Sequence, residues 1–498
     1  MKKLNDNALF LSCWYERSRP IYVMCLGGLI AFVMLLSYLS AMQYPPKELT
    51  PFQVMLNICE VTQIFVLLIF GPLFVAAMGS REKMSGTLDF HRNSPEGVYD
   101  KIAGLVFGGA WLEWVIFGIL LGAELLLSLG TFKGPERVIM FNVSIAISAL
   151  LFQTTAALFS LLTTKQDSKS NPLMLVVLLM FVGPMISMAV FTPIGSALSH
   201  VLGCGAAGYV FQKGGEWLPQ GFFFNLDLPL IVLQVISQVP LIFIMVNALA
   251  RTFCQPDSPA WSKESVLRIC FFILFLVTGF CVGAITHQDD IVYPWGGHHN
   301  GYHSVLLDQA GLYTFIDVAL GMAAGLFLAP TYFQRKKLLV LRAKGQVAND
   351  WLSDGASAFF PGLVYVGLST GFYLFYLLAL KVNWLCGSAI IIQAAAYILG
   401  FTGLLEYYRL SPYRNNKIWL VTVLGVWWCL LPWFGALLRN VTPGGEPLTL
   451  LSPLTGFIQT QKWLRGESSS DVVLLAAPVI AAVLCWIAAY KQQQTFKN

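Results

Sequence analysis

The sequence predicts an all-α, polytopic membrane protein with about 12 transmembrane helices, arranged as two six-helix halves. Of its 498 residues, 56% are hydrophobic and only 11% are charged, a balance that a soluble domain with an ordinary surface does not have. Its apolar runs are about 20 residues long, the length that a helix needs to cross about 30 Å of hydrocarbon. Strands of a membrane barrel are shorter and alternate in polarity, so a barrel is excluded.

The expected spans follow from the positions of these apolar runs. In the first half they lie near residues 21–42, 54–78, 102–127, 138–162, 172–192 and 226–250. In the second half they lie near residues 266–285, 306–330, 360–380, 385–405, 419–438 and 472–490.

The distribution of lysine and arginine predicts the orientation of the chain. With both termini in the cytoplasm, the inner segments collect the basic clusters at 81–83, 165–169, 335–337, 342–344 and 409–417. The outer segments carry fewer basic residues, as the positive-inside rule requires. We therefore expect a multi-pass protein of the cell (inner) membrane, and the net charge of +5 follows from this topology without calling for nucleic acid.

Two polar stretches of the first half lie next to predicted spans on the cytoplasmic side. Residues 7–19 mix apolar and aromatic side chains with Glu16 and Arg17, which suits a helix lying in the membrane interface. The second stretch runs from Ser80 to Lys101 and combines paired charges, a Gly-Thr step and a downstream proline. It predicts a docking surface, and the alternative is an ordinary charged loop that obeys the positive-inside rule.

Six residues of the second stretch carry a resemblance to a known family: Arg81, Glu82, Gly86, Thr87, Leu88 and Pro95. They match the pattern Arg-Glu-x-x-x-Gly-Thr-Leu with a following proline, and the segment therefore resembles the cytoplasmic coupling segment of ABC-2 type transporter permeases. Glu16-Arg17 is similar to the charged pair of the family's N-terminal elbow helix. We expect Glu82 and residues 86–88 to face water.

The resemblance implies a membrane-spanning permease subunit of an ABC transporter, which moves an unidentified substrate and favours export over import. This chain has no Gly-Lys step and hence no P-loop, so separate ABC ATPase subunits, two in number, would bind ATP and Mg²⁺. No cofactor in this chain and no enzymatic activity of its own are expected, and further outer-side or membrane subunits could join the complex. The alternative is an ion-coupled secondary transporter.

Loop lengths suggest that the architecture occurs twice, as a permease half in residues 1–255 and a divergent repeat in 256–498. Long outer segments at 193–225 and 439–471 precede the last span of each half. Residues 334–354 correspond to the coupling segment but lack Gly-Thr-Leu, so they are either a second docking surface or a basic anchor. The third and ninth spans share a small-residue pattern that permits close packing: Gly104-x-x-x-Gly108 and Gly367-x-x-x-Gly371.

Acidic residues within the spans are candidates for the transport pathway, because a charge in hydrocarbon is costly. We expect Glu113 and Asp317 to lie well inside the bilayer, as pathway residues or as carboxylates locked to a neighbouring helix. Glu60, Glu124 and Glu406 lie nearer the span ends and are expected to be interfacial. The loop at 287–303 contains four of the chain's six histidines and two aspartates, which are ligand types for zinc or copper. Their spacing fits no established metal site, so no metal is expected.

The topology is testable with cysteines introduced one at a time at Gly214, Asn300, Gly445, Ser94 and Ala348. We expect the first three to react with an impermeant thiol reagent in intact cells, because the charge asymmetry places them outside. The last two should react only after the membrane is opened. The reverse labelling at any two positions would overturn the orientation.

Overall fold

The computed structural model describes the chain in thirteen segments. These are residues 7–17, 27–28, 51–129, 135–162, 220–223, 226–254, 260–286, 302–344, 352–379, 384–412, 423–424, 426 and 476–495. The chain divides into two compact units. The first comprises Met1–Gly221 and Asp227–Ala260, and the second comprises Phe222–Leu226 and Trp261–Asn498.

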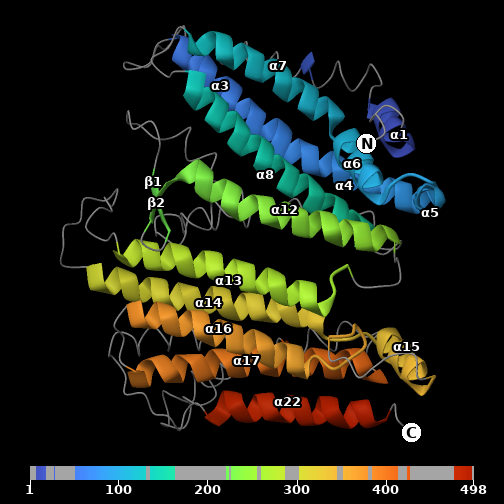
Figure 1. Cartoon of the computed structure of the whole chain (residues 1–498), viewed down its shortest axis with the longest axis vertical. Coiled ribbons are helices and arrows are strands. Elements are labelled where there is room, and N and C mark those ends of the chain that lie inside the picture. The colour runs from blue at the N-terminus through green and yellow to red at the C-terminus, as the bar shows by residue number, and fades with distance from the viewer. Residues whose placement is uncertain are drawn as a thin grey trace. The chain divides into compact units, whose positions relative to one another are not determined.

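The described part of the first unit is helical (Figure 1). Its elements are α1 (Ala8–Arg17), α3 (Pro51–Ile64), η2 (Phe65–Phe70), α4 (Gly71–Ser85), α5 (Thr87–Asn93), α6 (Val98–Gly109), α7 (Trp111–Ser128), α8 (Pro135–Leu162) and α12 (Leu230–Cys254). The short strands β1 (Gln220–Phe223) and β2 (Leu226–Pro229) pair with each other ahead of α12. The all-α expectation is therefore confirmed apart from this one pair of strands.

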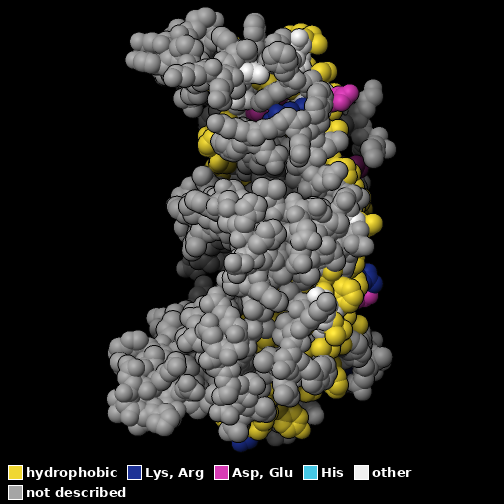
Figure 2. Space-filling model, turned by 90° about the vertical axis from the view of Figure 1, so that its left-hand side faces the viewer, with side chains coloured by type: hydrophobic (Ala, Val, Ile, Leu, Met, Phe, Trp, Pro, Cys, Tyr) yellow, Lys and Arg dark blue, Asp and Glu magenta, His cyan; other side chains and the backbone are white. Residues whose placement is uncertain are grey.

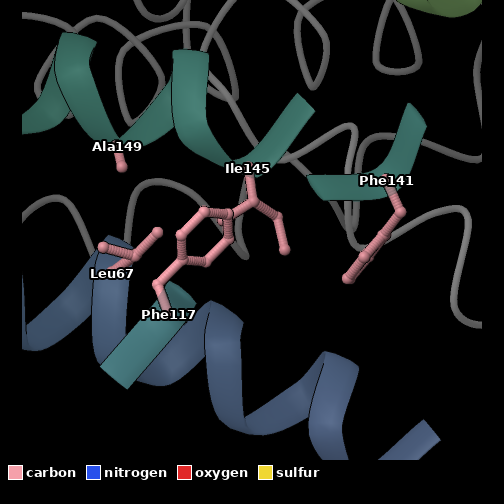
Figure 3. Close-up of a cluster of buried hydrophobic side chains, with 5 residues drawn as sticks. All are labelled: Leu67, Phe117, Phe141, Ile145 and Ala149. Atoms are coloured by element: carbon pink, nitrogen blue, oxygen red, sulfur yellow. The ribbon is translucent and has the colours of Figure 1, made fainter. Parts of the chain in front are cut away.

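The interior of the first unit is built around the continuous rod formed by α3, η2 and α4. Apolar side chains from η2, α7 and α8 meet in one buried cluster, namely Leu67, Phe117, Phe141, Ile145 and Ala149 (Figure 3). Inside a bilayer such contacts act through close van der Waals packing, because lipid tails are as apolar as leucine. A Cβ on Gly79 of α4 would lie 2.1 Å from the Ser160 hydroxyl of α8, so only glycine permits this approach.

The small-residue pattern of the third span has the packing role that the sequence suggested. A Cβ on Gly104 would lie 2.6 Å from the Asn7 side chain, and one on Gly108 would lie 3.1 Å from the backbone of Phe10. The absence of a side chain at both glycines therefore allows α1 to pack closely against α6. Gly367 and Gly371 have no such neighbour among the described residues, so close packing at the second pattern stays a prediction.

The third span is not one continuous helix. α6 ends at Gly109, Ala110 leaves the helical conformation at φ −115° and ψ 21°, and α7 begins at Trp111. Glu113 consequently lies in the first turn of α7, beside the break. A carboxylate there is favoured by the partial positive charge of a helix N-terminus, an effect that the apolar pattern did not reveal.

The second unit contains α13 (Lys263–Thr286), α14 (Tyr302–Leu328), α15 (Tyr332–Ala343), α16 (Phe359–Ala379), α17 (Trp384–Leu410) and α22 (Ala476–Gln494). α17 packs against α22 and α14, while α13 packs against α16. α14 and α15 are bent by 53° across a short break. Thr331 ends that break with a capping box, in which its side chain and that of Gln334 bond reciprocally to backbone amides.

Seven of the described helices are long and apolar enough to cross a membrane, or eight if the bent pair is one span. This supports a polytopic membrane protein but does not reach twelve spans. The expected span at 172–192 lies outside the described residues, and those at 21–42 and 419–438 do so apart from residues 27–28, 423–424 and 426. α22 ends in a polar turn with Lys491 and three glutamines. Exposed apolar side chains line one edge of the view in Figure 2, which suits helices facing lipid.

Candidate functional site

The polar stretch from Ser80 to Lys101 begins in the last turns of one helix and continues through a tight turn into a second, short helix. α4 ends at Ser85, Gly86 has φ 78° and ψ −3°, and α5 begins at Thr87. This left-handed conformation costs a residue with a side chain about 1–2 kcal/mol, whereas glycine adopts it freely. The Gly-Thr-Leu step therefore marks the position where the chain turns from α4 into α5.

A buried carboxylate joins three helices at this turn. Glu82 of α4 is only 9% exposed. Its Oε1 accepts a hydrogen bond from the Ser12 hydroxyl of α1 at 3.1 Å. Its Oε2 accepts from the Thr87 hydroxyl of α5 and lies 3.7 Å from the His91 Nε2. Because a buried carboxylate is stable only when its oxygens are paired, Glu82 fixes the positions of α1 and α5 on α4.

A buried lysine holds the other end of α5. Lys101 of α6 is 3% exposed, and its Nζ donates to the backbone oxygens of Arg92 at 3.2 Å and Ser94 at 3.0 Å. A cation is favoured at these carbonyls, where a helix exposes the negative end of its dipole. The Leu88 side chain, 2% exposed, adds an apolar anchor between the two polar ones.

The N-terminal helix is fastened to the same region, as the sequence did not foresee in detail. Asn7 Oδ1 accepts from the amides of Leu9 at 3.0 Å and Phe10 at 3.1 Å, and Asn7 Nδ2 donates to the Asp100 carbonyl. An asparagine directly before an apolar helical run is the signal of such a cap. The helix expected at 7–19 is thus present as α1, and it packs against α6.

The surface left by these contacts is partly apolar. Gly86 and Thr87 are exposed, as expected, and so are Arg81 and Pro95. Glu82 and Leu88 are buried, so the expectation that these two face water is wrong. Leu88 is buried because it lies on the inner face of α5, which packs on α4. Its outer face presents Phe90, which is 73% exposed.

The second unit also contains a buried carboxylate, Glu406, which lies against the residues that precede α16. Glu406 of α17 is fully buried, and its Oε2 accepts from the Ala358 amide at 2.8 Å and the Ser357 hydroxyl at 3.1 Å. The Lys263 ammonium of α13 donates to the carbonyls of Ala356 and Ser357. Backbone and hydroxyl donors make the burial of Glu406 possible, and its expected interfacial depth in the membrane stays a prediction.

The expected pathway residue Asp317 is buried in α14 of the second unit. Its carboxylate accepts from the Tyr365 hydroxyl at 2.9 Å and from the Ser369 hydroxyl at 2.5 Å, both on α16. Each carboxylate oxygen is thus paired, which fits a carboxylate locked to a neighbouring helix. Glu113, the other candidate, is fully buried in the first unit.

Two further carboxylates of the first unit are also buried. Glu60 on α3 is 1% exposed and Glu124 on α7 is fully buried, and their expected interfacial depth in the membrane stays a prediction. The neighbouring helices cover both of them, a packing that distance from the span ends could not reveal. Within the described residues no group of three or more metal-ligating side chains occurs, and the histidine loop at 287–303 lies outside those residues.

The role of Glu82 is testable by stability. We expect Glu82→Ala to lower the free energy of unfolding by about 2 kcal/mol, because hydrogen bonds to a charged group are lost while their donors stay buried. Asp89→Ala is the matched control. Asp89 pairs with Arg92 at 2.7 Å but is exposed, so its loss should cost about 0.5 kcal/mol or less. Equal thermal midpoints for the two purified variants would contradict the buried role.

Comparison with known proteins yields no match: no protein-family model, curated protein or solved structure is significantly similar to this chain. A functional assignment for this chain therefore depends on its own residues, above all on those that form and surround α5.

Proposed function

We propose that this chain is the membrane-spanning permease subunit of an ABC transporter, which moves its substrate with ATP hydrolysed by separate ATPase subunits. The observation that carries the proposal is the construction of the coupling segment. A seven-residue helix, α5, is held at one end by Glu82 and at the other by Lys101, while its outer face stays exposed. A passive tether needs no such anchoring.

The anchoring suits the transmission of force. Glu82 belongs to α4, the end of the α3–η2–α4 rod, and Lys101 belongs to α6 at the start of the third span. A push on α5 is therefore transferred to two membrane helices instead of being absorbed by a loop. Glu82 and Asn7 also tie α1 to the segment, so the N-terminal helix would move with it.

The exposed face of the segment suits a protein partner. Phe90 is 73% exposed and Met84 is 47% exposed, and the exposed Arg81 and Asp89 lie in the same stretch of chain. Aromatic and arginine side chains are the commonest anchors of protein interfaces. The partner that this surface fits is an ATPase that carries ATP and Mg²⁺ on the cytoplasmic side.

The complete assembly that we propose has about 12 spans in two six-helix halves, residues 1–255 and 256–498, with both termini in the cytoplasm. α15 would then offer the second, more basic contact, where Phe333 is 76% exposed. One chain would supply the whole transport pathway across the cell (inner) membrane and would bind two ATPases. We favour export as the direction of transport. Neither a cofactor nor an enzymatic site in this chain is part of the proposal.

The ion-coupled secondary transporter is the alternative, and one observation favours it. Glu60, Glu113, Glu124 and Asp317 are all buried in membrane helices, where ionisable side chains commonly mark ion pathways. Transport that needs an ion gradient and proceeds without ATP hydrolysis would select this alternative.

The docking surface is testable with Phe90→Ala. We expect about tenfold or greater loss of a co-purifying, ATP-hydrolysing partner, because truncating an aromatic anchor costs about 2 kcal/mol of binding free energy. Thermal stability should stay unchanged, since the Phe90 side chain is exposed.

The matched control is Phe243→Ala on α12, an equally exposed phenylalanine at 65% within a candidate membrane span. It should leave the partner bound. Retention of the ATPase by the Phe90 variant at the wild-type ratio would refute this docking surface.

The fused arrangement is testable by mass. Native mass measurement of the purified complex should give one 55.1 kDa chain with two ATPase subunits, because two halves already supply a pathway. Two copies of the chain with two ATPases would show instead that the first half dimerises.

A further inference from the structure

In the described part of the first unit, the two spans that flank the coupling segment are both interrupted. In the α3–η2–α4 rod, η2 is a π-helix, and the Gly71 amide donates to the Val66 carbonyl five residues back. Pro72 follows directly and has no amide to donate. In the third span, Ala110 separates α6 from α7. π-helices are rare and occur often at functional sites, so this region could be a place where the unit moves.

Both interruptions lie at the same level of the helix bundle. A Cβ on Gly109, next to the break, would lie 3.1 Å from the Cα of Val75, one turn beyond Gly71 on α4. From α8, Gln153 reaches both places. Its Oε1 accepts a hydrogen bond from the Trp114 Nε1 of α7 at 3.0 Å, and its Nε2 lies 2.6 Å from the position that a Cβ on Gly71 would take.

The interruptions divide the helices into two groups with different packing partners. α3 packs against α7, and we call these two helices the α3–α7 pair. α4 packs against α5, α6 and α8, and α1 packs against α6, so that α1, α4, α5 and α6 form the α4–α6 group. α8 runs through this level as one continuous helix and contacts both α4 and α7. Each chain connection between the pair and the group therefore crosses an interruption.

The Gln153 amide has a hydrogen-bond donor without an acceptor. Its side chain is fully buried. Because an indole N–H can only donate, the bond from Trp114 identifies the oxygen end of the amide, so the nitrogen end faces Gly71. Nε2 has no hydrogen-bond partner among the described residues, although buried polar groups are almost always paired. A buried donor left unused in this conformation points to a second conformation in which it is used.

We propose that η2 with Pro72 and the break at Ala110 form one hinge, about which the α4–α6 group turns relative to the α3–α7 pair. Gln153 is the positioning residue of this hinge. When the rod bends at Pro72, a carbonyl of η2 turns away from the helix axis, as at other proline kinks. It then accepts from Gln153 Nε2, while the bond from Trp114 is kept. The hinge goes beyond the proposed function, because it carries movement of α5 to α3 and α7 whether ATP or an ion gradient drives transport.

Distances between spin labels test the hinge in the purified full-length protein in lipid nanodiscs, without any partner. The labels are attached through a non-natural amino acid, because the native Cys254 is exposed. One pair spans the hinge, at the exposed Met84 of α4 and Leu126 of α7. The control pair lies on the continuous helix α8, at Ile139 and Phe159, about 30 Å apart. We expect two distances for the first pair and one for the second. A single narrow distance for the first pair would overturn the proposal.

Two substitutions test the parts of the hinge. Pro72→Ala supplies the missing amide and should abolish the second distance, because the rod can then continue without a kink. Its matched control is Pro240→Ala, at a proline inside α12 of the same unit, which should leave both distances unchanged. Gln153→Met removes the amide at similar size and should lower the population at the second distance about threefold to tenfold, since one hydrogen bond is lost. Unchanged populations in Pro72→Ala or in Gln153→Met would contradict the hinge, as would an equal change in Pro240→Ala.

Discussion

The architecture of the first unit around the turn between α4 and α5 depends on the burial of one carboxylate, Glu82. A buried ionised group is tolerated only if its oxygens accept hydrogen bonds, and here the donors are the hydroxyls of Ser12 and Thr87 from two other helices. This requirement fixes α1, α4 and α5 as one body. Gly86 supplies the left-handed turn that brings Thr87 back to Glu82, so the conformation of the turn and the polar contact depend on each other.

The second unit meets the same constraint with different residues. Glu406 accepts hydrogen bonds from the residues that lead into α16, and Lys263 donates hydrogen bonds to carbonyls of that same stretch. In the first unit Lys101 has the equivalent role on carbonyls at the end of α5. Each unit thus combines a buried glutamate with a buried lysine that donates to backbone oxygens. The resemblance is one of chemistry, and whether the halves are repeats stays a prediction.

The sequence predicted the features that depend on local chemistry. The mixed composition of residues 7–19 predicted α1 and the long apolar runs predicted the apolar helices, whereas the left-handed turn at Gly86 was not predicted. The sequence did not reveal which side chains are buried, because burial depends on neighbours from distant segments. Glu82 was expected to face water and is buried, and the enclosure of Glu60, Glu124 and Glu406 by neighbouring helices was not predicted. The break at Ala110 was missed although Gly108 and Gly109 directly precede it, because glycine is frequent in membrane helices and the apolar run continues across this position. The described helices give seven or eight spans instead of twelve.

The most direct test of ATP-driven coupling is a photo-cross-link from the exposed face of α5. A photoreactive phenylalanine analogue in place of Phe90 should capture, in cell membranes, a polypeptide that contains a P-loop, and the yield should change when ATP is supplied. The same analogue in place of Phe243, which is also exposed, should not capture it. Failure to capture a P-loop protein from position 90, with the chain inserted and abundant, would contradict the proposed function.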